Sequence, residues 1–140
     1  MTTIRNRKLF LSVAGASAFA VGCLAFLAPR VLLIDVKAAA EASGAAVVMA
    51  RTTGVLLLAV GALSWAIRGD EDSPTMRSFL AANFALQIAI MPVDPWAFAT
   101  GVWGTPAAFL PNTILHILLA AGFAWFRWGA GRGEGTVARA

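Results

Sequence analysis

Four long apolar stretches separated by short polar turns run along the chain. They cover residues 9–28, 45–67, 76–93 and 107–128, and none holds more than one charged residue. A helix needs about 20 mostly apolar residues to cross the hydrocarbon core of a bilayer. Because lipid offers the backbone no hydrogen-bonding partner, such stretches must fold as helices that pack on one another. The pattern predicts an all-α protein, an antiparallel four-helix transmembrane bundle in which residues 1–140 form one domain.

The composition agrees with a membrane protein and narrows the partners. Hydrophobic residues make up 59% of the chain and charged residues 13%, against about 25% charged residues in soluble domains. A net charge of +4 would suggest nucleic-acid binding in a soluble protein. Here we expect the basic residues to set the topology and to face anionic lipid headgroups. The single cysteine, Cys23, excludes an internal disulfide and a multi-cysteine metal site. We therefore expect the lipid bilayer as a partner, no nucleic acid and no metal.

The basic residues predict the orientation, because lysine and arginine next to a span resist translocation. Eight of the 11 fall on the side of the two termini: Arg5, Arg7, Lys8, Arg68, Arg77, Arg127, Arg132 and Arg139. The turn at residues 93–105 holds no basic residue and one acidic residue, Asp94. The tryptophans, which prefer the headgroup layer, fall at expected helix ends: Trp65, Trp96, Trp103, Trp125 and Trp128. We predict a multi-pass protein of the cytoplasmic (inner) membrane with both termini in the cytoplasm.

The segments outside the spans carry signals of their own. Pro29 ends the first span, and the aliphatic residues after it predict a segment lying in the outer interface. The alanine-rich residues 38–46 either extend the second span or form a loop. The amino end also resembles a signal peptide or a lipoprotein processing site, but the apolar run continues past Cys23 to Leu27, which favours an uncleaved helix. The tail, residues 129–140, is predicted to be disordered.

Two local patterns predict where a helix starts and how helices pack. Ser73 followed by Pro74 is typical of a helix start. The acidic residues 70–72 before it are predicted to form a solvated connection. Small residues recur in the first two spans, and we predict that they pack helices within one chain: Ala14, Ala18, Gly22, Ala50, Gly54 and Gly61.

Polar side chains inside the spans form a layer towards the outer ends. At a rise of about 1.5 Å per residue, Gln87 and Asn112 are expected at one depth, and Asn83 and His116 about one turn deeper. The four-residue spacing within each span puts each pair on one helix face. With a further residue from the second span, they are the candidate ligand-binding residues: Arg51, Asn83, Gln87, Asn112 and His116.

Arg51 interrupts the second span and needs an acceptor, because an unpaired charge in hydrocarbon costs several kcal/mol. Asp94 is the first candidate for an ion-pair partner, with Glu41 and Asp35 as alternatives. Arg51 could instead extend its side chain to the headgroups.

Three interpretations of the polar layer stay open. Amides and histidine commonly hydrogen-bond between membrane helices, at about 0.6 kcal/mol each, which would make the layer structural. Alternatively the layer lines a pocket for a quinone-like head group, where arginine and amides bind a carbonyl oxygen and His116 exchanges a proton. An ion or proton path is the third, although no carboxylate lies in the middle of a span. One histidine cannot ligate haem on both sides, and we predict no catalytic residue.

Short motifs also resemble those of a known group of proteins. The first span ends in Ala28-Pro29-Arg30, Met49-Ala50-Arg51-Thr52-Thr53-Gly54 opens the second, and Ser64-Trp65-Ala66-Ile67-Arg68 ends it. In this layout the chain resembles small bacterial four-helix membrane proteins, near the DoxX-like proteins. The resemblance implies a partner subunit of a membrane oxidoreductase close to the quinone pool, with Arg51 as a polar anchor and Gly54 as a close-packing glycine.

Together these observations lead to one expected function and two alternatives. We expect an accessory protein or subunit of a larger membrane complex, without catalytic activity of its own and with other membrane subunits as partners. The first alternative is a protein that binds a quinone-like or other small molecule, and a quinone is then the one cofactor expected. The second is small-solute transport, which would need an oligomer because four helices enclose little water.

Overall fold

The computed structural model describes residues 2–32 and 44–129, and in these ranges the protein is all-α. Its elements are α1 (Thr2–Leu27), α2 (Pro29–Leu32), α3 (Gly44–Ile67), α4 (Pro74–Ile90), α5 (Val93–Ala99), α6 (Pro106–Ala124) and a closing π-helical turn, η2 (Trp125–Gly129). Four stretches of the described chain are long and apolar enough to cross a membrane: Ile4–Leu27, Gly44–Ile67, Pro74–Ala99 and Pro106–Gly129. The protein is therefore a four-helix membrane bundle, as predicted.

The helix boundaries follow local sequence, with two differences from the prediction. The Ser73 side chain accepts a hydrogen bond from the backbone N–H of Met76 at 3.1 Å and Pro74 follows, so α4 starts as predicted. Because Arg and Lys are good helix formers, α1 begins at Thr2 rather than at residue 9. The third span continues past residue 93 to Ala99, and a short break at Pro92 divides it into α4 and α5. The predictions for residues 33–43 and for the tail after residue 129 lie outside the described residues.

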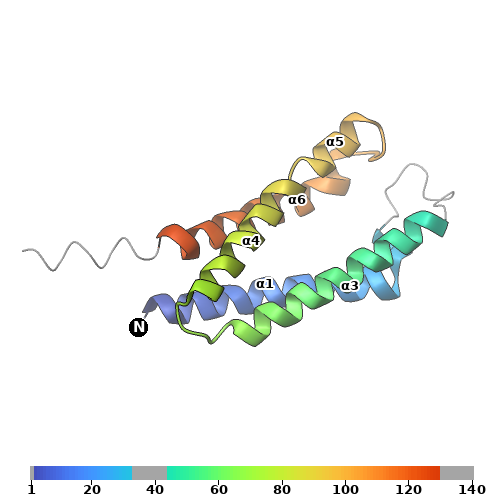
Figure 1. Cartoon of the computed structure of the whole chain (residues 1–140). Coiled ribbons are helices and arrows are strands. Elements are labelled where there is room, and N and C mark those ends of the chain that lie inside the picture. The colour runs from blue at the N-terminus through green and yellow to red at the C-terminus, as the bar shows by residue number, and fades with distance from the viewer. Residues whose placement is uncertain (1, 33–43, 130–140) are drawn as a thin grey trace, which may run out of the picture.

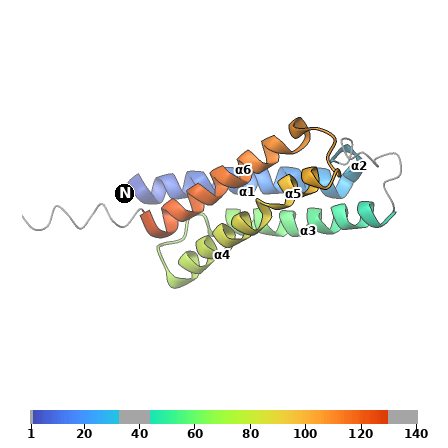
Figure 2. The same ribbon diagram turned by 90° about the horizontal axis from the view of Figure 1, so that it is seen from above.

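Helices α1 and α3 form a closely packed antiparallel pair (Figures 1 and 2). A methyl group on Gly54 would lie 2.7 Å from the backbone nitrogen of Phe26 and 2.8 Å from the carbonyl oxygen of Gly22. One on Gly61 would lie 2.8 Å from the carbonyl oxygen of Gly15. Only a hydrogen atom fits at these crossings, so the predicted packing within the chain is confirmed for Gly22, Gly54 and Gly61.

Helices α4 and α6 form a second antiparallel pair, inclined so that the two pairs diverge towards α5 (Figure 1). The pairs meet near the start of α1. There, buried apolar side chains form the core: Leu11, Ala14, Met76, Leu80 and Phe123. Phe10 of α1 packs edge-on against Phe123 of α6, with ring centroids 5.0 Å apart. Away from this core the pairs separate, which leaves room between them.

One end of the molecule gathers the start of α1, the α3–α4 turn and η2 (Figure 2). We call it the basic end, after the residues of the described chain that those segments carry: Arg5, Arg7, Lys8, Arg68, Arg77 and Arg127. Arg7 is 5% exposed. Its guanidinium donates to the carbonyl oxygen of Asp70 and lies 3.9 Å from the carboxylate of Asp72. Asp72 also accepts a hydrogen bond from Arg77 at 2.6 Å, which holds the pKa of the Asp72 carboxyl below its usual value. The turn is thus tied to α1 and α4, a role for Arg7 that its sequence context did not predict.

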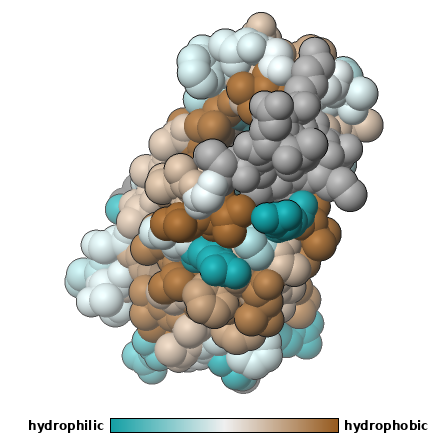
Figure 3. Space-filling model, turned by 90° about the vertical axis from the view of Figure 1, so that its right-hand side faces the viewer, coloured by the Kyte–Doolittle hydropathy of each residue, from teal (hydrophilic) through white to brown (hydrophobic). Residues whose placement is uncertain are grey.

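The outer surface of the bundle is largely apolar. Many large aliphatic and aromatic side chains of the spans face outwards, among them Leu56, Leu118 and Trp125, each more than 60% exposed. Figure 3 looks onto the end opposite the basic end, where apolar residues cover much of the surface and hydrophilic ones form isolated patches. The exposed apolar side chains along the spans are suited to lipid rather than to water.

Candidate functional site

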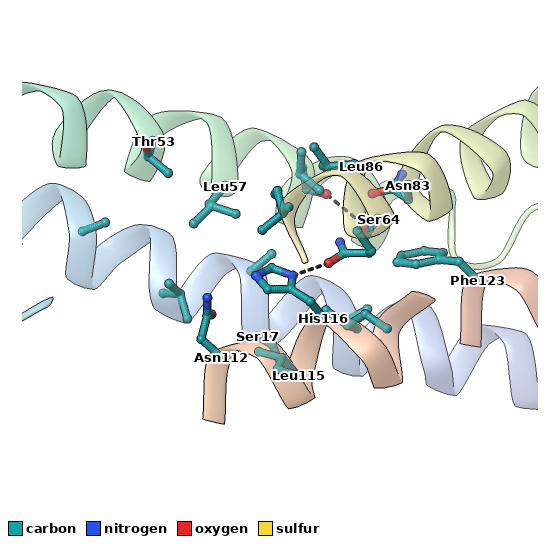
Figure 4. A pocket seen from close by; sticks show the side chains of 18 of the residues that line it. Ser17, Thr53, Leu57, Ser64, Asn83, Leu86, Asn112, Leu115, His116 and Phe123 are labelled. Carbon is teal, nitrogen blue, oxygen red and sulfur yellow. Dashed lines mark hydrogen bonds between the residues drawn. The ribbon is translucent and has the colours of Figure 1, made fainter. Parts of the chain in front are cut away.

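A cavity of about 360 Å³ lies between the two helix pairs, where they diverge (Figure 4). We call it the interhelical cavity. Its wall is mostly alanine, leucine and valine, with seven polar residues: Ser17, Thr53, Ser64, Asn83, Gln87, Asn112 and His116. Ala14 and Phe123 belong both to this wall and to the core, so the core closes the cavity towards the basic end.

The central polar contact joins α4 to α6. The Nδ1 atom of His116 lies within hydrogen-bond distance of the side-chain oxygen Oε1 of Gln87. An amide oxygen only accepts, so Nδ1 carries the hydrogen and donates it. The other ring nitrogen lies on the side of the imidazole away from Gln87 (Figure 4). Gln87 is 7% exposed and His116 is half-buried, so this contact lies inside the bundle.

Two further polar residues lie deeper, towards the core. Ser64 of α3 is 2% exposed and donates its hydroxyl hydrogen to the carbonyl oxygen of Val60 at 2.8 Å. Asn83 of α4 is 6% exposed and donates from Nδ2 to the carbonyl oxygen of Phe79 at 3.0 Å. Each bond gives one donor of the polar side chain an acceptor within its own helix, which lowers the cost of burying it where water is absent.

A second hydrogen bond joins α6 to α5, nearer the end of the molecule opposite the basic end. Asn112 of α6 donates from Nδ2 to the carboxylate of Asp94 of α5 at 2.7 Å. Gln87 thus pairs with His116 rather than lying level with Asn112, and Asn83 does not reach His116. The predicted register was wrong by about one helical turn, because α5 carries the third span on to Ala99 and shifts its outer end.

Arg51 takes no part in the interhelical cavity. It is exposed on α3 and does not belong to the cavity wall. The expected ion pair with Asp94 is not formed, because the carboxylate of Asp94 lies against Asn112 instead. The alternative partners, Glu41 and Asp35, lie outside the described residues. Of the five candidate ligand-binding residues, the structure brings four to one cavity and places Arg51 elsewhere.

Sequence reasoning missed other residues of the cavity wall. Three of the predicted packing residues, Ala14, Ala18 and Ala50, line the cavity, whereas Gly15 and Gly22 of α1 lie at the crossing with α3. Three hydroxyls also went unnoticed: Ser17, Thr53 and Ser64. Thr53, Leu57, Val60 and Ser64 are spaced by four, three and four residues, so the helical period could have placed them on one face.

The chemical character of the cavity follows from its wall. Its volume falls in the lower part of the range of small-molecule sites, about 300–1,000 Å³. No aspartate, glutamate, lysine or arginine of the described chain lines it. The described residues also hold no group of three or more His, Cys, Asp or Glu side chains that could bind a metal. The arrangement suits an uncharged, mostly apolar molecule with one polar group.

Comparison of the chain with protein-family models, with curated proteins and with solved structures gave no match.

Proposed function

We propose that the protein binds a small, uncharged amphiphile in the interhelical cavity. The single observation that carries the proposal is a cavity of about 360 Å³ inside a membrane bundle, with buried polar side chains gathered at its closed end. A buried polar group in lipid is costly unless it has a partner. The apolar wall offers dispersion contacts to a hydrocarbon body, and the polar end fixes the orientation of a head group.

The position of the cavity supports entry of a ligand from the membrane. The two helix pairs diverge away from the core, and Leu32 and Ala50 line the cavity on the side away from the basic end. A lipid-soluble molecule can therefore approach between the pairs while the core holds the other end together. This closed end gives no support to solute transport by a single chain.

Native mass spectrometry of the full chain, released from native nanodiscs, tests the proposal. We expect the wild type to carry a bound small molecule. Ala50→Phe adds a phenyl ring to the cavity wall and should remove that molecule. Ala59→Phe places the same ring on the exposed face of α3, outside the wall, and should leave it bound. A small molecule retained equally by both variants, or absent from the wild type, would refute the proposal.

We further infer that the protein lies in the cytoplasmic membrane with the basic end in the cytoplasm. The support is that six basic residues of the described chain gather at the end where residues 2 and 129 lie, and basic residues there would resist translocation. In a Cys23→Ser background, a membrane-impermeant maleimide should label Thr100→Cys in intact cells and spare Thr3→Cys. The reverse labelling would overturn this orientation.

A second candidate is an accessory subunit of a larger membrane complex, without catalysis of its own. It is favoured because most of the described chain lies in four membrane-length stretches. These described residues therefore leave little protein outside the bilayer that could carry out chemistry. The same native spectra distinguish the two candidates. A protein partner in fixed stoichiometry would support the subunit, and a chain that is always alone would count against it.

A further inference from the structure

At the closed end of the interhelical cavity, the polar side chains donate hydrogen bonds to other atoms of the protein. The hydroxyl of Ser64 donates to the carbonyl oxygen of Val60, and Nδ2 of Asn83 donates to that of Phe79. Both directions are fixed, because a backbone carbonyl can only accept. Nδ1 of His116 donates to Oε1 of Gln87, which fixes the tautomer of a neutral imidazole in the same way.

These bonds leave acceptor atoms for a ligand on three of these side chains. In neutral His116 the lone pair of Nε2 lies on the side away from Gln87 (Figure 4). The amide of Asn83 is planar, so turning its nitrogen to Phe79 leaves Oδ1 on the opposite side. Ser64 keeps the lone pairs of its oxygen. Among these side chains, the donors that these bonds leave over are the amide nitrogen of Gln87 and the second hydrogen on Nδ2 of Asn83.

We propose that the cavity selects a lipophilic molecule with a hydroxyl head group, as in a phenol or hydroquinone, over a molecule whose head group only accepts. This inference rests on the proposed function and specifies its ligand class. A hydroxyl can donate its hydrogen to Nε2 of His116 and accept at its oxygen from Gln87. A quinone carbonyl could accept from Gln87, but it has no hydrogen to donate to Nε2 of His116. The expected arginine donor for such a carbonyl, Arg51, lies outside the cavity wall.

Paired probes test this selection on the full chain in nanodiscs. We use 4-nonylphenol and its methyl ether, 4-nonylanisole, which share body and tail and differ in the hydroxyl hydrogen. Binding is counted only where Ala50→Phe abolishes it, which removes partitioning into lipid. We expect the wild type to bind the phenol about tenfold more tightly, the scale of one lost hydrogen bond in a buried site.

Two variants test whether His116 causes the preference for the phenol. His116→Phe removes the Nε2 acceptor and should bring the ratio of the two affinities close to one. Thr52→Val, an exposed position next to the cavity-lining Thr53, should leave the ratio unchanged. A merely structural loss would weaken both probes and keep their ratio. The wild-type ratio stands as a test even where His116→Phe fails to fold.

The outcomes distinguish a failure of this inference from a failure of the proposed function on which it rests. Equal cavity binding of both probes, or tighter binding of the ether, would overturn the selection and leave a small-molecule site in place. If neither probe binds and native spectra of the wild type carry no small molecule, the proposed function itself is lost.

Discussion

Gly54→Ala should weaken the bundle at the crossing of α1 and α3. The added methyl carbon would lie 2.7 Å from the backbone nitrogen of Phe26 and 2.8 Å from the carbonyl oxygen of Gly22. These partners are backbone atoms, so no side chain can rotate away. The two helices must separate by about 0.7 Å to restore ordinary contact, and a gap of that size forfeits a quarter to a half of each dispersion contact.

The magnitude follows from the contacts that this separation loosens. A patch the size of one buried leucine makes about 40–60 atom contacts of roughly 0.1–0.2 kcal/mol each, so about 3 kcal/mol is lost. Alanine has the better helix propensity by about 1 kcal/mol, which offsets part of that loss. The steric term wins, and we expect the free energy of unfolding to fall by about 2 kcal/mol, within the range of other overpacked cores.

The assay is reversible unfolding in mixed micelles of dodecylmaltoside and SDS, followed by far-ultraviolet circular dichroism. Gly69→Ala is the matched control, because nothing lies within 4 Å of a methyl group there. Gly22→Ala shares the same crossing, so the double variant should lose less stability than the sum of the two single variants. If Gly54→Ala and Gly69→Ala unfold within about 0.5 kcal/mol of each other, the close-packing argument fails.

Two further predictions concern the basic end and the core beside it. In Gly122→Ala the added methyl carbon would lie 2.2 Å from the ring of Phe10, so the same assay should show a loss of about 1–3 kcal/mol, and Phe10→Leu in the same chain should recover part of it. The hydrogen bond from Arg77 lowers the pKa of Asp72 in the folded state. The pair therefore stabilises the protein at pH values above the unfolded pKa near 3.8, and this stabilisation is lost as the pH falls through the folded pKa. Asp72→Asn should therefore make stability less dependent on pH below about 4, with a small effect because the pair is half exposed; an unchanged profile would show that it contributes nothing.

The sequence by itself determined the number, length and approximate ends of the spans. These depend on local properties: a run of apolar residues long enough for the bilayer, a serine and proline that start α4, and Pro29 after α1. Gly54 could also be identified as a packing residue, because small residues four apart on a membrane helix, such as Ala50 and Gly54, permit close approach. Each of these signals acts within one helix and needs no knowledge of its neighbours.

The tertiary structure alone decided which polar groups meet. Helical spacing places Asn83 and Gln87 on one face, but it does not fix the tilt or the vertical shift of α4 against α6. The continuation through α5 brought Gln87 to His116 and Asp94 to Asn112. A shift of one turn, about 5.4 Å, changes every such pair.

The same limit applies to the cavity and to Arg51. Lipid is as apolar as the bundle interior, so an alanine or leucine pattern does not say whether a face meets lipid, another helix or an empty space. Ala14 and Ala18 look like packing residues in the sequence and line the cavity in the structure. Which way Arg51 points is set by the rotation of α3, and the glycines that lock α3 onto α1 fix that rotation only once the two helices are together.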